Sequence, residues 1–196
     1  GTRVSSGTVS KLNKQIYEKI EAWRNRPIEH AHPYVYLDGI VLKRSWGGEV
    51  RNVSVLVAVG VAEDGFREIL GVAEGAKEDR EGWSSFLRYL KERGLRGTEL
   101  FITDKCIGLV ESLAEHFPEA RWQRCMVHFY RNIFSHVPRG PKVRDVAAML
   151  KAIHASEDLE SARDKAASVV AKLHAMKLRK AADLVESGIE ETFSYY

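Results

Sequence analysis

Two aspartates stand in apolar stretches where a carboxylate needs a partner. Asp38 ends the run Tyr-Val-Tyr-Leu-Asp, and Asp104 ends the run Leu-Phe-Ile-Thr-Asp. Burying a carboxylate costs several kcal/mol unless a cation or hydrogen-bond donors compensate. Because Mg²⁺ prefers hard oxygen ligands and often takes one or two protein carboxylates, this pair is a candidate metal site. The alternative is that the two side chains cap turns or pair with Lys105 or Arg44.

A basic segment provides a second kind of chemistry. Residues 121–144 contain six Lys or Arg and no Asp or Glu, with aromatic residues interleaved. Such a segment attracts phosphate in a salt-dependent way, and its aromatic rings can stack on unpaired bases. In the alternative interpretation the aromatic residues belong to the core and the arginines are solvated; Trp122 in particular is expected to pack. The candidate DNA-binding residues are Lys105, Arg121, Arg124, His128 and Arg131.

Cys125 and His128 form a Cys-x-x-His motif at the start of a predicted helix, so both face the same side. Cys106 and His116 would bring the possible zinc ligands to four, but the spacing matches no common zinc pattern. We therefore expect a structural role for this motif. Glu190 and Glu191 are acidic neighbours near a helix end, for which a solvated face is the expected role. Glycine-rich nucleotide motifs and the Gly-x-Ser-x-Gly motif are not found, which argues against nucleotide-cofactor and serine-hydrolase functions.

Composition sets the class of protein. The 196 residues are 44% hydrophobic and 29% charged, with a net charge of +3 and two cysteines. These values indicate one globular domain, with or without a helical appendage, and exclude collagen-like and wholly disordered chains. A disulfide framework is excluded by the cysteine count. The apolar runs are too short to span a membrane and no leader peptide is recognised, so we expect a cytoplasmic protein with no membrane partner.

The order of predicted elements places the two aspartates. A helix is expected over residues 8–24, then three strands (34–37, 51–60 and 66–73) as an antiparallel meander with a turn at Gly47-Gly48. The middle strand shows little alternation, which is typical of a strand covered on both faces. The remaining expected elements are helices at 80–93 and 107–117, strands at 100–102 and 120–124, a helix at 126–137, and three helices beyond Pro138.

This βββαβαβα order indicates a mixed α/β sheet followed by an all-helical unit. The predicted domains are residues 1–30 (a helical segment with a linker), 31–137 (the α/β core) and 138–196 (the helical unit). In such a sheet the first and fourth strands are normally parallel neighbours, so Asp38 and Asp104 are expected to converge.

Several motifs are familiar. They are Tyr-Leu-Asp-Gly at 36–39, Thr-Asp-x-x-x-Gly-Leu at 103–109 and, above all, Trp-Gln-Arg-Cys-x-Val-His-Phe at 122–129. With them, the chain resembles bacterial insertion-sequence transposases of the Mutator type from about Ser6 to its last residue. The resemblance implies a ribonuclease H-like core of the DDE type, in which Asp38 matches the first aspartate and Asp104 the second. Cys125 and His128 match the family's Cys-x-x-His signature, whereas Lys105-Cys106 departs from the family pattern, and Lys105 can pair with Asp104 or touch phosphate.

The resemblance also implies what lies outside these residues. The family's glutamate follows a helical insertion, to which residues 141–196 correspond, and residues 5–12 resemble the end of a helix-turn-helix recognition helix. We therefore expect a chain cut at both ends that lacks the third carboxylate and catalyses little by itself. The alternative is that Glu190 or Glu191 substitutes for this carboxylate, against the solvated role expected of such an acidic pair.

The implied function is Mg²⁺- or Mn²⁺-dependent DNA strand cleavage and strand transfer at insertion-sequence ends, with Asp38 and Asp104 as catalytic and metal-binding residues. The implied partners are double-stranded DNA, both the terminal inverted repeats and the target, and further copies of the protein near the nucleoid. One alternative is a catalytically inactive DNA-binding or assembly module on the same fold. A nuclease that cuts without joining is another.

Overall fold

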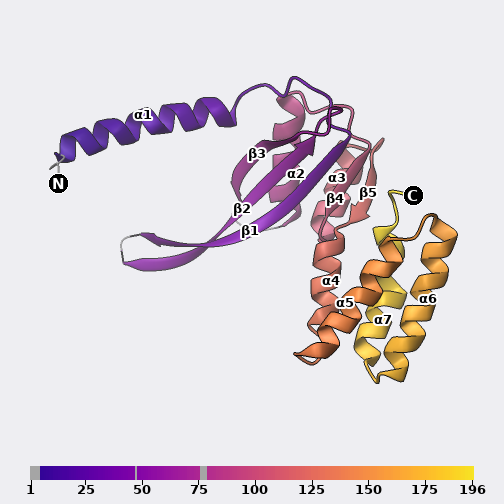
Figure 1. The fold of residues 1–196 in the computed structure, drawn as a ribbon. Helices are drawn as coiled ribbons and strands as arrows, with labels where there is room; N and C mark the ends of the chain where they lie inside the picture. Colours follow the sequence, from indigo (N-terminus) through magenta and orange to yellow (C-terminus); the bar gives the residue numbers. More distant parts are fainter. Residues whose placement is uncertain (1–4, 47, 76–78) are drawn as a thin grey trace. The chain divides into compact units, whose positions relative to one another are not determined.

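A computed structural model describes residues 5–46, 48–75 and 79–196, in two compact units, Gly1–Thr98 and Glu99–Tyr196 (Figure 1). Both units combine helices and strands, which confirms the mixed α/β class. Across the described ranges, no helix has the length and apolar character needed to cross a membrane.

The first unit contains the expected antiparallel meander, with strand order β3-β2-β1. The predicted first helix, the three strands and the following helix are all confirmed, with small shifts at their ends except at the end of the first strand. Their bounds are α1 Ser6–Arg24, β1 Tyr34–Trp46, β2 Glu49–Val61, β3 Arg67–Gly75 and α2 Arg80–Glu92.

Strand β1 is much longer than its apolar run predicted. It pairs with β2 from Tyr34↔Val61 to Trp46↔Glu49, whereas β3 pairs only with residues 54–61 of β2. The far part of β1 and β2 is therefore a two-stranded ribbon, visible in Figure 1. Gly48 lies in its turn with φ +83°, a left-handed conformation that suits glycine; Gly47 lies outside the described residues.

The meander has one well-buried face. In β2, fully buried residues such as Leu56 and Ala58 alternate with half-buried ones, and the first four residues are exposed. The expectation that this strand is covered on both faces is met only in part: from Val53 onward one face is buried and the other is half-buried, because the core fills only one side of the pleat.

Helix α2 covers β3. Asp79 caps its first turn by accepting a hydrogen bond from Gly82 N (3.0 Å), and its buried face consists of Trp83, Phe86, Leu87 and Leu90. A Cβ on Gly71 of β3 would lie 2.8 Å from Leu90, so the close packing of helix on strand requires glycine there.

The second unit begins with a parallel β-α-β arrangement. Strands β4 (Leu100–Thr103) and β5 (Arg121–Arg124) pair in parallel, and α3 (Ile107–His116) connects them. The helices that follow are α4 (Met126–Phe134), α5 (Pro141–His154), α6 (Leu159–Ala175) and α7 (Arg179–Gly188), with a final 3₁₀ turn, η1 (Glu190–Thr192). The three helices predicted beyond Pro138 are confirmed.

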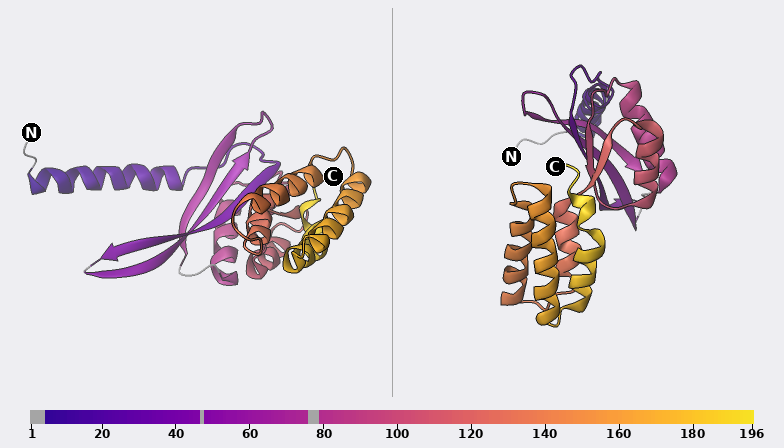
Figure 2. Two further views of the ribbon diagram at one scale, coloured as in Figure 1. Left: turned by 60° about the horizontal axis from the view of Figure 1, so that its bottom comes forward. Right: turned by 90° about the vertical axis from the view of Figure 1, so that its right-hand side faces the viewer.

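Helices α4 to α7 share one hydrophobic core (Figure 2). Phe129 and Ile133 of α4 are fully buried in it beside Leu150, Leu173 and Val185. Helix α4 ends at Phe134 rather than near Val137. Beyond Phe134 the chain tightens into turns, in which the His136 N–H donates to the Ile133 carbonyl (3.0 Å) and the Val137 N–H to the Phe134 carbonyl (3.1 Å).

A chain of polar contacts ties α4, α5 and η1 together inside this core. The Tyr130 hydroxyl donates to the Leu150 carbonyl (2.9 Å) and lies 2.6 Å from His154 Nδ1. His154 Nε2 lies 2.8 Å from Thr192 Oγ1. Burial raises the pKa of Tyr130 to about 12, and burial also lowers the pKa of His154, an effect that the Leu150 carbonyl opposes.

These contacts predict how the stability of the unit depends on pH. Because the pKa of folded His154 lies below its usual value of 6.5, the folded state favours the neutral ring. The contribution of neutral His154 to the free energy of unfolding is complete above pH 6.5 and is lost as the pH falls through the pKa of the folded state. His154→Gln should therefore reduce the drop in melting temperature between pH 7.5 and pH 5 by about 2 to 4 °C, measured by calorimetry. His136→Gln, at an exposed position, is the control and should leave the drop unchanged; equal effects of the two changes would contradict the prediction.

Candidate functional site

Asp38 lies within β1, opposite Val57 of β2, and its side chain is exposed. The alternation of β1 sends Val35 and Leu37 into the core and Tyr36 and Asp38 to the other face. The expectation of a buried carboxylate at a strand tip was therefore wrong, because β1 continues for eight residues beyond Asp38. An exposed Asp38 has no desolvation cost to offset, so its metal-binding role depends on the family resemblance.

Asp104 directly follows β4, as predicted, and is half-buried. Its Oδ1 accepts a hydrogen bond from the Lys105 backbone N–H (2.8 Å), while Thr103 Oγ1 donates to the Asp104 carbonyl (2.7 Å). Within the described ranges, Oδ2 has no hydrogen-bond partner. The carboxylate is thus fixed at the strand end with one oxygen available to a cation.

Lys105 does not pair with the Asp104 carboxylate through its ammonium group. Its Nζ lies 2.5 Å from Glu191 Oε1, and Arg124 Nη1 lies 3.4 Å from Glu191 Oε2. One carboxylate from η1 thus meets two cations, one beside Asp104 and one at the end of β5. We call this group the Glu191 triad.

Glu191 is the site residue that sequence reasoning missed. The prediction of a solvated acidic pair is confirmed for Glu190, which is exposed and pairs with Arg163. Hydrogen bonds from Arg163 lower the pKa of Glu190. The same prediction was wrong for Glu191, whose side chain is 26% exposed. The signal available in the sequence was weak: Glu191 precedes Thr192 and Phe193, which are buried and fix the orientation of the turn.

Arg124 is the least exposed of the predicted DNA-binding residues, at 9%. Its guanidinium lies over the Phe129 ring, 4.8 Å from the centroid. A Cβ on Gly188 would come within 3.0 Å of both Arg124 Nη1 and the Phe129 ring, so the end of α7 must be small for the arginine to fit. Arg124 Nε is buried and has no hydrogen-bond partner among the residues that the structure describes.

The other predicted DNA-binding residues differ in exposure. Arg121 and Arg131 are exposed, on β5 and α4, whereas His128 of α4 is half-buried. Trp122 packs as expected, and its indole N–H donates to Thr103 Oγ1 (2.9 Å). The structure thus brings Lys105 and Arg124 together through Glu191, and leaves Arg121 and Arg131 facing solvent.

The Cys-x-x-His motif spans the start of α4, where Cys125 holds the N-cap position. Cys106 and Cys125 are half-buried, and among the described residues neither forms a disulfide. Among the residues the structure describes, one group of three candidate metal ligands has its donor atoms within 4.8 Å of one another: His174, Asp183 and Glu186, all exposed. Cys106, His116, Cys125 and His128 are not gathered in this way. Exposed acidic groups commonly meet without an ion.

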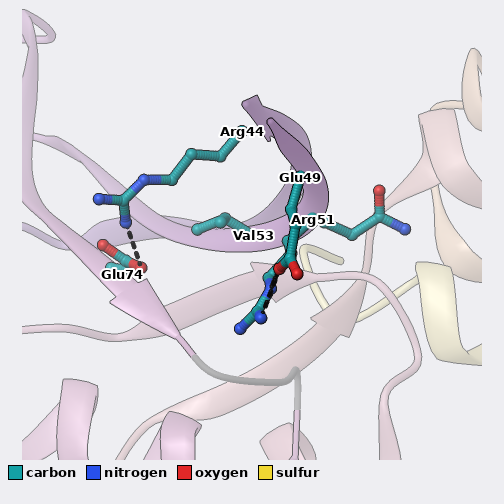
Figure 3. A pocket seen from close by; sticks show the side chains of 6 residues that line it. Arg44, Glu49, Arg51, Val53 and Glu74 are labelled. Atoms are coloured by element: carbon teal, nitrogen blue, oxygen red, sulfur yellow. Dashed lines mark hydrogen bonds and ion pairs between the residues drawn. The ribbon is translucent and has the colours of Figure 1, made fainter. Parts of the chain in front are cut away.

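The first unit contains a hollow of about 420 Å³ on the β1-β2 ribbon (Figure 3). Its charged residues form two ion pairs, Arg44 with Glu74 (3.6 Å) and Arg51 with Glu49 (2.6 Å). Because the charges of these pairs cancel, this hollow does not concentrate positive charge as a phosphate site does.

Comparison with known proteins adds the family. The model of the family "Transposase, Mutator family" matches residues 1–196. The chain is 36% identical over 196 residues to the transposase for insertion sequence element ISRM5 of Rhizobium meliloti, covering 100% of this chain and 49% of that protein. It is 40% identical over 162 residues to the transposase for IS1081 of Mycobacterium tuberculosis, covering 82% of this chain and 39% of that protein.

Among solved structures, the chain is similar to the Drosophila P element transposase in a strand transfer complex, with 10% identity, covering 95% of this chain and 64% of that chain. The TM-score of 0.35 is too low to establish a shared fold. The chain spans about half the length, or less, of these curated relatives. Because the family model covers it from end to end, the chain belongs to the Mutator family of transposases.

Proposed function

We propose that this chain carries most of the catalytic core of a DNA transposase. In this proposal the enzyme cleaves and joins DNA strands at the ends of an insertion sequence. Residues 31–137 form a ribonuclease H-like core, residues 138–196 form a helical insertion and residues 1–30 lead in from a DNA-binding region. The observation that carries the proposal is Asp104, held at the end of β4 with one free carboxylate oxygen and with Lys105 and Arg124 nearby in the same unit.

We propose that Asp38 and Asp104 hold a divalent metal ion, Mg²⁺ or Mn²⁺, as the family resemblance implies. Asp104 suits this role because its Oδ2 accepts no hydrogen bond from the described residues and carboxylate oxygens are ligands that such ions prefer. When bound, the ion supplies Lewis-acid stabilisation of charge developing on the phosphoryl oxygens. The backbone N–H of Lys105 orients Asp104, and the basic residues hold the DNA backbone.

The DNA partner is supported by the distribution of charge. Arg121 and Arg131 are exposed and lie within a segment free of acidic residues. Neutralising phosphates releases counterions, so these residues provide affinity and orientation but no sequence specificity. In the full-length enzyme we propose that the DNA is the element's terminal inverted repeats and the target, bound by an oligomer.

The catalytic assignment predicts the effect of removing each carboxylate. Asp38→Asn and Asp104→Asn should each lower Mg²⁺-dependent cleavage and joining of terminal-repeat DNA by at least about a hundredfold, because a metal ligand contributes several kcal/mol to the transition state. The measurement is a strand-transfer assay with the protein at its full encoded length. Asp145→Asn, an exposed change in the same unit as Asp104, is the matched control.

Full activity of either variant would overturn the assignment of that aspartate. A wild-type enzyme that binds DNA equally well with and without Mg²⁺ and cleaves none would favour the inactive binding module. Cleavage without joining would favour a simple nuclease.

The phosphate-contact assignment predicts the salt dependence of binding. Arg121→Gln and Arg131→Gln should each reduce the slope of log K against log salt concentration by about 0.9, because each removes one counterion-releasing contact. Fluorescence anisotropy of a labelled duplex measures this slope. Arg163→Gln changes the net charge equally at a residue already paired with Glu190, so its slope should match wild type. Identical slopes for all the variants would rule out the assigned contacts.

A further inference from the structure

Two cations beside Asp104 converge on a single carboxylate in the Glu191 triad. We infer that Lys105 and Arg124 form a binding site for one DNA phosphate, and that Glu191 occupies this site until a phosphate displaces it. The inference rests on the proposed function for the identity of the nucleic acid. It adds a site that is closed by the chain itself in the absence of DNA.

Arg124 has fewer hydrogen bonds than its burial requires. A guanidinium carries five N–H donors. Within the described residues, those of Arg124 make one hydrogen bond, the 3.4 Å contact with Glu191, while Nε is buried and unpaired. Burying a cation is costly unless it is both paired and hydrogen-bonded. The site therefore lacks a strong acceptor, and a phosphate provides one because guanidinium groups bind it through two parallel hydrogen bonds.

Glu191 owes its position to its neighbours. Thr192 is fully buried and contacts His154, and Phe193 is buried in the helical core. The Ser194 hydroxyl donates to the Trp122 carbonyl (2.7 Å), which fastens the chain after η1 to β5. Thus η1 stays in place on these contacts even when the Glu191 side chain turns away, and releasing the carboxylate requires only a change of side-chain rotamer.

The strength of the contacts suits exchange. Lys105 is 47% exposed and Glu191 26% exposed, and ion pairs that are open to solvent to this degree contribute little to stability. A carboxylate and a phosphodiester each carry one negative charge on two terminal oxygens, so one can replace the other without changing the net charge of the site. A duplex has an added advantage, because neighbouring phosphates can bind Arg121 and Arg131 at the same time.

The test compares Glu191→Gln with Glu190→Gln. Both changes remove one negative charge from adjacent residues of η1, but only the first frees Lys105 and Arg124, since Glu190 binds Arg163. Binding of a labelled duplex is measured by anisotropy in EDTA, so that no metal-dependent step contributes. Inorganic phosphate is titrated separately, and the Arg124 Nε–H resonance is followed by NMR.

We expect Glu191→Gln to bind the duplex about tenfold more tightly than Glu190→Gln, the size of one charge-assisted hydrogen bond regained. The Arg124 resonance should respond to phosphate at correspondingly lower concentration. Adding Lys105→Gln should remove most of this gain. In the wild-type chain, phosphate should also shift the side-chain carboxyl resonance of Glu191, which tests the displacement without any substitution.

Equal binding by Glu191→Gln and Glu190→Gln, or an unchanged Glu191 resonance on saturation with phosphate, would overturn the inference. If Glu191→Gln binds inorganic phosphate more tightly than Glu190→Gln does, but binds the duplex no more tightly, the phosphate site stands and DNA is not its ligand. That result would contradict the proposed function and not the phosphate site. Loss of strand transfer in the aspartate variants is measured independently of both outcomes.

Discussion

The burial of the Arg124 guanidinium is the constraint on which the charged site of the second unit depends. A cation that is nine-tenths buried must be compensated, and here four elements contribute: β5 carries it, α4 places Phe129 beneath it, α7 ends in Gly188 to make room, and η1 presents Glu191. Without Phe129 or Glu191 the buried guanidinium would have even fewer contacts. The positions of the end of β5, the start of α4 and the end of α7 are therefore linked through the Arg124 guanidinium.

This dependence links the helical segment to the strand ends. Helix α4 falls within residues 31–137, the predicted α/β core, yet its buried residues lie in the same hydrophobic cluster as those of α5, α6 and α7. This hydrophobic cluster therefore includes residues on both sides of Pro138, although the sequence pattern changes there. Because η1 follows directly from α7, the packing of the helices determines where Glu191 lies. The helical segment thus acts as the support that holds an acidic residue against the end of β5.

Local patterns predicted most of the fold. The apolar spacing of Trp83, Phe86, Leu87 and Leu90 is complete within one helix, and Gly94, with φ +105°, follows its C-terminus. The position of Asp104 after β4 also followed from a short apolar run that ends in Thr-Asp. Such features depend on residues close together in the chain, so sequence spacing was enough to find them.

What the sequence could not predict depends on distant partners. The exposure of Asp38 depends on which face of β1 the core fills. The length of β1 depends on pairing with β2, since residues 40–45 are all exposed and show no alternation of buried and exposed positions. The Glu191 triad joins residues 86 and 67 positions apart. No periodicity connects such residues, and an acidic pair beside a helix end has the same local sequence whether it is solvated or bound.

The placement of Glu191 also bears on the chemistry of Asp104. Lys105 follows Asp104 directly, and an ammonium group on that carboxylate would compete with a metal ion for the same oxygen. In the structure Lys105 Nζ binds Glu191 instead, and only the backbone N–H of Lys105 contacts Asp104, at Oδ1. A phosphate in place of Glu191 would hold the ammonium group equally well. If Lys105 binds phosphate and Asp104 binds a metal ion as proposed, either anion keeps the Lys105 ammonium group away from Oδ2, so that these two residues can be neighbours in the chain without neutralising one another.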